Sequence, residues 1–334
     1  MLPSFEEVTR NLSALEAWEQ LRKHRDRSVA RRIWHIGVGL AIAAIGCYLI
    51  AFAMTESSPA DDPDDPLYLF LFGILIVICS PIYIHQAIRR AHKKYSRYYK
   101  ELIVPPLVAN MVSQASYPDF SDSRFECRFE PDGYISREKM LEIPIFTGLE
   151  EANRYQGEDY FQGTLGVTDF QLCEIYAEKE ERDESGNKNR YPLFKGLVFI
   201  ADFHKNFEGT TVIVSRKGKA IARLKHVGDR MGTISHEFDK LFRVRTTDET
   251  TARYLLPVNM LERFIELRKR FPKNGMSICL HEGTLTIAIH LIDYFEAKGI
   301  KKLEEGGILH TYNEIRSILD VVDILNLNTR IWTK

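Results

Sequence analysis

Two residues near the middle of the chain have the types and spacing of a catalytic or metal-binding pair. Asp202 and His204 directly follow the apolar run 197–201 (LVFIA). If this run is a strand, residues i and i+2 share one face, which places a carboxylate and an imidazole about 7 Å apart. Such a pair could act as acid and base or as two metal ligands. The alternative is that a buried strand emerges into solvent here, beside Lys205.

A third side chain would complete such a site, and the chain offers carboxylates for it. We take Glu158 as the third member of a candidate hydrolase set with Asp202 and His204; Asp159 and Glu174 are alternatives. Candidate ligand contacts are Lys195, Asp159 and Arg253. Turn geometry around 157–166 and a solvated strand end at Lys195 explain these residues without a ligand.

The remaining patterns argue against several classes of protein. The sequence has no nucleotide-binding P-loop, serine-hydrolase GxSxG or zinc-protease HExxH motif. The five cysteines are scattered without CxxC spacing, so neither a zinc ribbon nor a disulfide framework is indicated. The net charge of −1 gives no nucleic-acid footprint. We therefore predict no metal, no cofactor and no nucleic-acid partner.

Two apolar stretches near the start of the chain predict that the protein is anchored in a membrane. Residues 33–54 contain one imidazole and no formal charge, and residues 67–84 have no side chain that is charged at neutral pH. As helices they would be about 33 Å and 27 Å long, close to the roughly 30 Å hydrocarbon core of a bilayer. They predict a transmembrane hairpin within residues 33–85.

The charges around the two stretches predict its orientation. The linker 55–66 carries five acidic residues and no Lys or Arg, whereas both outer flanks are basic. Lys and Arg near span ends stay in the cytoplasm, so both termini should lie there. Basic flanks also attract anionic lipids. The lipid-facing candidates are Arg22, Lys23, Arg25, Arg27, Arg31, Arg32, Arg89, Arg90, Lys93 and Lys94.

Helical extensions are expected on the cytoplasmic side of both spans. Residues 1–32 form an amphipathic arm, read as one helix from a Ser4-x-x-Glu7 capping box to about residue 30. Residues 86–150 continue the second span as a stalk and connector, interrupted at Pro105-Pro106. We expect the two extensions to pair as a coiled-coil-like stalk; self-association between protomers is the alternative use of the apolar seam.

Residues 151–334 have the texture of a sheet-rich domain. About seven strands are expected, including a hairpin over 159–180, the buried run 197–201 and a hairpin around Glu282-Gly283. Helices are expected at 257–271 and after a capping box at Thr311-x-x-Glu314. The class is α+β, with mainly antiparallel strands and a C-terminal helix. A pleckstrin-homology-like sandwich is a possible analogy, against which the helix before the last hairpin counts.

Several segments together resemble a bacterial family of two-span membrane proteins that is catalogued as a domain of unknown function (number thirty-one thirty-seven). The resembling stretches are 155–161 (YQGEDYF), 168–170 with Glu174, 194–197 running to 201–203, 252–256 (ARYLL), 262–263 and 325–332 (LNLNTRIW). The family pattern has Asn at the position of His204. The resemblance implies a bacterial inner membrane and a cytoplasmic C-terminal domain, and carries over no catalytic residue.

These observations favour a non-enzymatic binding or scaffold protein at the inner leaflet, which recognises a protein, peptide or lipid headgroup. The expected partners are the phospholipid bilayer and a protein partner or a second copy of the chain. One alternative is a membrane-tethered hydrolase with the Asp/His/Glu set. Another is an anionic-lipid-binding domain that uses the basic connector Arg216, Lys217, Lys219, Arg223 and Lys225.

Overall fold

The structure is a computed structural model of the whole chain, and it divides into two compact units. It describes residues 3–12, 16–55, 65–113, 124–146, 148–203, 206–218, 227–291, 295, 308–325 and 327. One unit is a helical hairpin within residues 13–103 together with 297–308. The other is a sheet domain built from residues 1–12, 104–296 and 309–334. The α+β class predicted from the sequence is confirmed.

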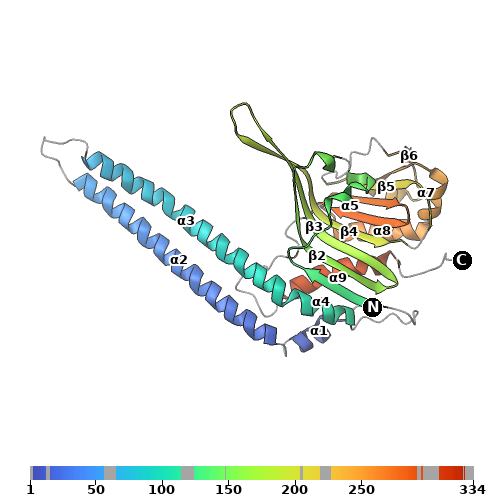
Figure 1. Cartoon of the computed structure of the whole chain (residues 1–334), viewed down its shortest axis with the longest axis horizontal. Coiled ribbons are helices and arrows are strands. Elements are labelled where there is room, and N and C mark those ends of the chain that lie inside the picture. The colour runs from blue at the N-terminus through green and yellow to red at the C-terminus, as the bar shows by residue number, and fades with distance from the viewer. Residues whose placement is uncertain are drawn as a thin grey trace. The chain divides into compact units, whose positions relative to one another are not determined.

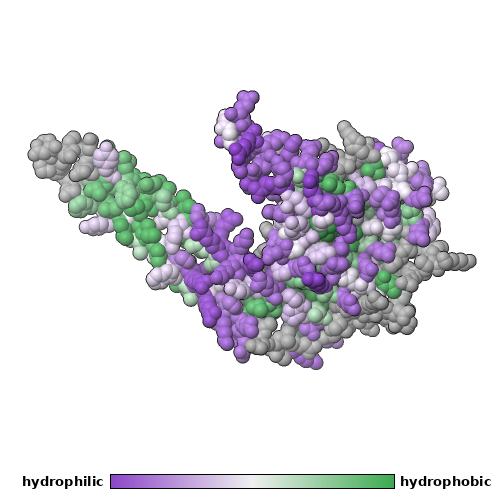
Figure 2. All heavy atoms as spheres, in the orientation of Figure 1, coloured by the Kyte–Doolittle hydropathy of each residue, from purple (hydrophilic) through white to green (hydrophobic). Residues whose placement is uncertain are grey.

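The hairpin consists of α2 (Glu16–Thr55) and α3 (Asp65–Leu102), which pack against each other along their lengths (Figure 1). Both helices are long and apolar enough to cross a membrane. They approach closely at two glycines: a Cβ atom added to Gly46 would lie 2.9 Å from the carbonyl oxygen of Gly73. Figure 2 shows apolar side chains gathered over part of this hairpin and hydrophilic ones over the rest.

The extensions of α2 and α3 beyond the apolar stretches lie side by side within one chain. The rings of His24 and Tyr98 stack with centroids 4.0 Å apart, beyond the apolar stretches of both helices. The stretch predicted as one helix from residue 4 to about 30 contains α1 (Phe5–Leu12) and α2, and residues 13–15 between them lie outside the described residues. The Ser4–Glu7 capping box forms, with the Ser4 amide donating to Glu7 Oε2 over 2.7 Å. Leu15 lies outside the described residues.

The first helix belongs to the sheet domain because its apolar side packs there. The rings of Phe5 and Tyr312 contact each other edge to face, and the Tyr312 hydroxyl donates to the carbonyl of Pro3. Val8 is fully buried. An apolar seam indicates that a helix packs against a partner, but it does not identify that partner. The seam seen in the sequence therefore includes residues that pack in the sheet domain and residues that pack in the hairpin.

The described strands of the domain form one nine-stranded sheet in the order β1-β2-β3-β4-β9-β8-β5-β7-β6, with every neighbouring pair antiparallel. The strands are β1 (Arg124–Glu130), β2 (Arg154–Gly166), β3 (Thr168–Arg182), β4 (Lys188–Asp202), β5 (Thr210–Ser215), β6 (Asp229–Met231), β7 (Phe242–Thr246), β8 (Met276–His281) and β9 (Thr284–Ile289). The seven-strand pleckstrin-homology analogy does not fit, because β9 and β8 lie between β4 and β5.

The centre of the sheet is buried on both faces, as the run 197–201 predicts, since all five of its residues are buried. On one face, here called the upper face, a cluster including Cys173, Ile175, Val198 and Phe194 packs under short helices. These are α5 (Arg137–Leu141), η1 (Pro144–Phe146) and η2 (Leu149–Glu151). Among the described residues, these helices cover part of the upper face and leave a pocket beside them.

The other helices are α4 (Val104–Ser113), α6 (His236–Leu241), α7 (Glu249–Leu255), α8 (Val258–Arg270) and α9 (Ile308–Ile324). The break before α4 falls where Pro105-Pro106 predicts it, with both prolines in the first turn. The sequence reading missed β1, β6, α6 and α7, which are seven residues or fewer. Helix α9 begins at Ile308, so Thr311 and Glu314 lie inside it and do not cap its start.

Strands β3 and β4 continue past the rest of the sheet as a two-stranded arm over residues 179–191 (Figure 1). A ladder of opposite charges follows the arm, in which the Glu180 carboxylate pairs with Lys188 at 3.0 Å and Arg190 at 3.0 Å. Asn153 stands where β2 would continue beside β3. Its side-chain amide donates to the Glu180 carbonyl and accepts from the Glu180 amide, both over 2.7 Å.

Candidate functional site

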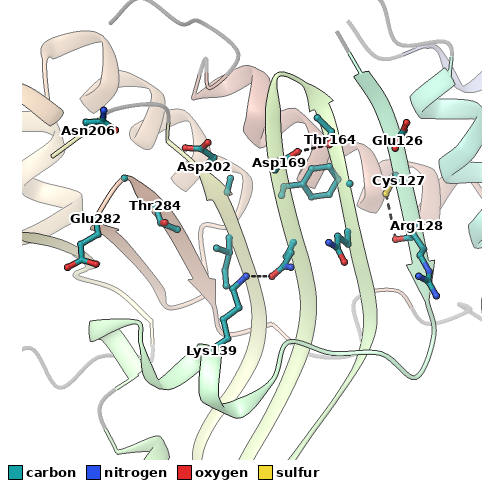
Figure 3. Close-up of a pocket in the computed structure, with 17 residues that line it drawn as sticks. Glu126, Cys127, Arg128, Lys139, Thr164, Asp169, Asp202, Asn206, Glu282 and Thr284 are labelled. Atoms are coloured by element: carbon teal, nitrogen blue, oxygen red, sulfur yellow. Dashed lines mark hydrogen bonds between the residues drawn. The ribbon is translucent and has the colours of Figure 1, made fainter. Parts of the chain in front are cut away.

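The open part of the upper face is a shallow polar basin of about 940 Å³ (Figure 3). It extends over β1, β2, β3, β4 and β9 and is bounded by α5 and by the turn between β8 and β9. We define the basin by its polar lining residues Glu126, Arg128, Lys139, Gln162, Thr164, Asp169, Gln171, Asp202, Asn206, Glu282 and Thr284.

Strand register brings these polar residues to one face. Directly paired residues of antiparallel strands point to the same side. Thr164 pairs with Asp169, and Asp202 pairs with Thr284. Phe170 pairs with Ala201, so Asp169 and Asp202 stand side by side on the opposite face from that pair. A polar row therefore crosses the sheet at the point where the apolar core of the upper face ends.

Hydrogen bonds hold the floor of the basin in place. The Thr164 hydroxyl donates to Asp169 Oδ1 over 2.6 Å, and the Lys139 ammonium donates to Gln171 Oε1 over 2.6 Å. Lys139 is presented by α5, whose N-terminus is capped by the Ser136 hydroxyl. The local sequence from Ser136 thus folds into a short helix that places a cation at the border of the basin.

The turn between β8 and β9 shapes the opposite border. Glu282 adopts a left-handed conformation with φ of 45°, and Gly283 follows with φ of 74°. Two successive positive φ values suit a tight hairpin turn, in which the twist of the loop matches that of the strands. The Gly283 carbonyl accepts a hydrogen bond of 2.8 Å from the Phe203 amide. This bond fixes the turn, and with it Glu282, against the end of β4.

Negative charge exceeds positive charge in the basin. Among the described residues, four carboxylates line it, from Glu126, Asp169, Asp202 and Glu282, against two cations. Of those cations, Lys139 already bonds Gln171, and Arg128 forms an ion pair of 2.9 Å with Glu130. The basin therefore suits a polar or positively charged ligand, since an anion would meet mainly like charge.

The structure does not bring the predicted catalytic set together. Asp202 lines the basin at the end of β4, and His204 lies outside the described residues. Glu158 pairs with Glu174, which in turn pairs with Leu197. Leu197 is five residues before Asp202, so Glu158 points to the opposite face and lies about 17 Å farther along the strands. Acid–base chemistry shared by Asp202 and Glu158 is therefore not supported.

The three predicted ligand contacts also lie away from the basin. Lys195 forms an ion pair of 2.5 Å with Glu178, and Arg253 forms one of 2.5 Å with Glu249 on the same helix. Asp159 is buried at a bulge of β2 with φ of 58°. The residues that the sequence reading missed are the basin residues of β1, β2 and α5. Their signal is polar side chains at alternate positions, such as Gln162 and Thr164.

The described part of the chain shows no group of side chains suited to metal binding or thiol chemistry. No cluster of three or more His, Cys, Asp or Glu residues there could hold a metal ion. Burial raises the pKa of the Cys127 thiol at the basin edge to about 12. A thiol with such a pKa is almost fully protonated at neutral pH and makes a poor nucleophile. The basin is thus equipped for hydrogen bonding and charge pairing.

The comparisons with known proteins agree with the resemblance seen in the sequence. Residues 192–327 match the family described as "Protein of unknown function (DUF3137)". No curated protein and no solved structure matches the chain. The matched segment begins within β4 and extends past α9, so it includes the basin residues Asp202 and Thr284, whereas β1, β2 and the whole of β3 precede it.

Proposed function

We propose that this protein is a membrane-anchored binding protein of the bacterial inner membrane, whose cytoplasmic domain recognises a polar, positively charged segment of a partner protein. The observation that carries the proposal is the basin, an open polar surface whose described lining residues include two more carboxylates than cations. Shape and charge of this kind suit a peptide segment with Lys or Arg side chains. An anionic lipid headgroup would be repelled from the same surface.

The anchor and its orientation complete the proposal. Two helices with the length and composition of membrane spans support a hairpin anchor. The basic flanks of the spans and the acidic linker between them support cytoplasmic termini. The sheet domain then works at the inner leaflet, where a partner meets it within a confined volume. A second copy of the chain is one possible partner.

The two alternative functions have less support. A hydrolase that uses Asp202, His204 and Glu158 conflicts with the opposite faces occupied by Asp202 and Glu158. Lipid binding by the basic connector has lost one candidate cation, because the Arg216 guanidinium donates to the carbonyls of Asp239 and Phe242. Lys219, Arg223 and Lys225 lie outside the described residues.

Photocrosslinking in intact cells tests the proposal. A photoreactive amino acid at Gln162, inside the basin, is compared with one at exposed Glu237 on α6. We expect a discrete crosslinked protein band from position 162 only. Asp169→Asn combined with Asp202→Asn should reduce that band at least fivefold, because two of the four carboxylates are neutralised. The matched variant, Glu184→Gln with Glu237→Gln, removes the same charge elsewhere and should leave the band unchanged.

Two results would contradict the proposal. One is a crosslink pattern at position 162 that consists of lipid adducts or of no adduct. The other is an equal loss of the protein band in both charge variants, because that would assign the effect to total charge. Crosslinks between two copies of the chain would identify the partner as a second protomer.

A further inference from the structure

The two basic flanks, far apart in the sequence, lie at the same level of the hairpin. His35 Nδ1 and the Tyr83 hydroxyl are 2.9 Å apart, and the rings of His24 and Tyr98 stack. These two contacts fix which residues of α2 and α3 lie opposite each other between them. Positions 27 and 31 of α2 therefore lie beside positions 87–95 of α3. The basic clusters of the two helices consequently form one band directly below the apolar stretches.

Four cations of this band share one side of the hairpin. Ser28 and Ala87 are buried and mark the contact line of each helix. In a pair of antiparallel helices, equal offsets from the contact line fall on the same side, because a two-fold axis perpendicular to the pair relates them. Arg31 and Arg90 each come three residues after these markers. Arg27 lies four residues before Arg31, and Lys94 lies four residues after Arg90, each along the same ridge of its helix. All four side chains are exposed.

Within the described part of the chain, no ion pair includes any of these four residues, here called the cation quartet. Among the described residues, the ion pairs nearby join Arg25 to Asp26 and Arg97 to Glu101. Side chains four apart on a helix are about 6 Å apart at Cβ, and packed helices lie about 8–10 Å apart. Four like charges in so small an area repel one another unless an anion lies between them.

We infer that the cation quartet is a binding site for a phospholipid whose headgroup carries two phosphates. The quartet consists of two cation pairs, and each pair can hold one phosphate by charge-assisted hydrogen bonds. Its location favours a lipid over a free phosphate compound. Arg31 lies two residues before Ile33, where the apolar stretch begins, and Trp34 beside it is 70% exposed, as expected of an aromatic residue at a bilayer interface. The inference rests on the proposed membrane anchoring.

The test compares two variants of equal charge in the full-length protein, purified in a neutral detergent. Arg27→Gln, Arg31→Gln, Arg90→Gln and Lys94→Gln remove the quartet. The matched control, Arg22→Gln, Lys23→Gln, Arg89→Gln and Lys93→Gln, removes four cations that point away from the contact line on both helices. Native mass spectrometry then measures the binding of diphosphatidylglycerol, of twice the amount of phosphatidylglycerol, and of inorganic pyrophosphate.

We expect the wild type and the control to bind diphosphatidylglycerol at least tenfold more tightly than phosphatidylglycerol, and the quartet variant to lose this preference. Equal losses in both variants, or equal binding of the two lipids, would overturn the inference. Pyrophosphate binding as tight as that of the lipid would assign the site to a soluble phosphate compound and also overturn it. Flotation of the wild type with cell membranes tests the anchoring separately, so a failure there is distinguishable.

Discussion

The hairpin and the sheet domain use apolar side chains in opposite ways. In the domain, large side chains such as Phe238 and Phe264 are fully buried. In the hairpin, Trp34, Tyr68 and Phe72 remain more than half exposed, and the helices meet instead at glycines. Within a bilayer an exposed apolar side chain costs nothing, and close backbone approach supplies the contact between helices. This difference supports the proposed bilayer setting of the hairpin.

The largest test of this comparison is the same substitution in both regions. Phe264→Ala in α8 should lower the free energy of unfolding of the sheet domain by about 3–5 kcal/mol, because it opens a cavity in a closed core. Phe72→Ala in α3 removes a side chain that is 56% exposed and should leave that stability unchanged. Chemical denaturation of the purified protein, followed by the near-ultraviolet signal, measures both. Similar losses would mean that Phe72 packs in a protein core.

The second test addresses the glycine contact of the hairpin. Gly46→Leu forces α2 and α3 apart, because even a Cβ atom there would lie 2.9 Å from the Gly73 carbonyl oxygen. Overpacking of this kind costs about 1–3 kcal/mol. Gly37→Leu is the control, since no atom lies within 4 Å of a Cβ at that position. The yield of a disulfide between cysteines placed at positions 24 and 98 should fall for the first variant only. An unchanged yield would refute the contact.

A smaller effect is expected from a helix cap in the sheet domain. The Ser235 hydroxyl accepts a hydrogen bond of 3.2 Å from the Phe238 amide at the start of α6. Ser235→Ala leaves that amide without its cap and should cost about 1 kcal/mol. Ser235→Asn restores an acceptor and should recover most of the loss. If thermal unfolding shows the same midpoint for Ala and Asn, the cap does not contribute.

The smallest effect concerns the charge ladder of the arm. Hydrogen bonds from Lys188 and Arg190 lower the pKa of Glu180 to about 2. A carboxyl with a lowered pKa stabilises the fold above its ordinary pKa, and that contribution disappears as the pH falls through about 2. The arm should therefore keep its structure between pH 7 and pH 5. A titration followed by the carboxyl carbon shift of Glu180 checks this, and Lys188→Gln should raise the midpoint. A midpoint near 4.5 in the wild type would contradict the pairing.

The sequence predicts the long, regular elements of this fold well, for a physical reason. Local patterns of hydropathy, turn residues and charge predict both spans, the β8–β9 hairpin and α8. The partner of an amphipathic helix is a tertiary property, which is why α1 was joined to α2. The capping pattern Thr311-x-x-Glu314 misled for a similar reason. Thr311 is buried inside α9, which begins three residues earlier at Ile308.

The candidate site was less accessible to sequence reasoning. Asp202 was found because a polar residue after a buried run is conspicuous. Its neighbours Asp169 and Thr284 come from strands 33 and 82 residues away, and only the register joins them. Glu158 was misassigned to the same site because periodicity within one strand does not reveal which face of another strand it matches.

The side chain of Asn153 has a consequence for how this domain can change over time. Since its amide saturates both backbone groups of Glu180, the lateral hydrogen bonding of the sheet stops there without requiring any residue farther out. The hairpin beyond that point can be lengthened or shortened two residues at a time, which keeps the alternation of its faces. The length of the β3–β4 arm can therefore differ among related proteins. The core of the domain and the basin at the other end of the same strands would be unaffected.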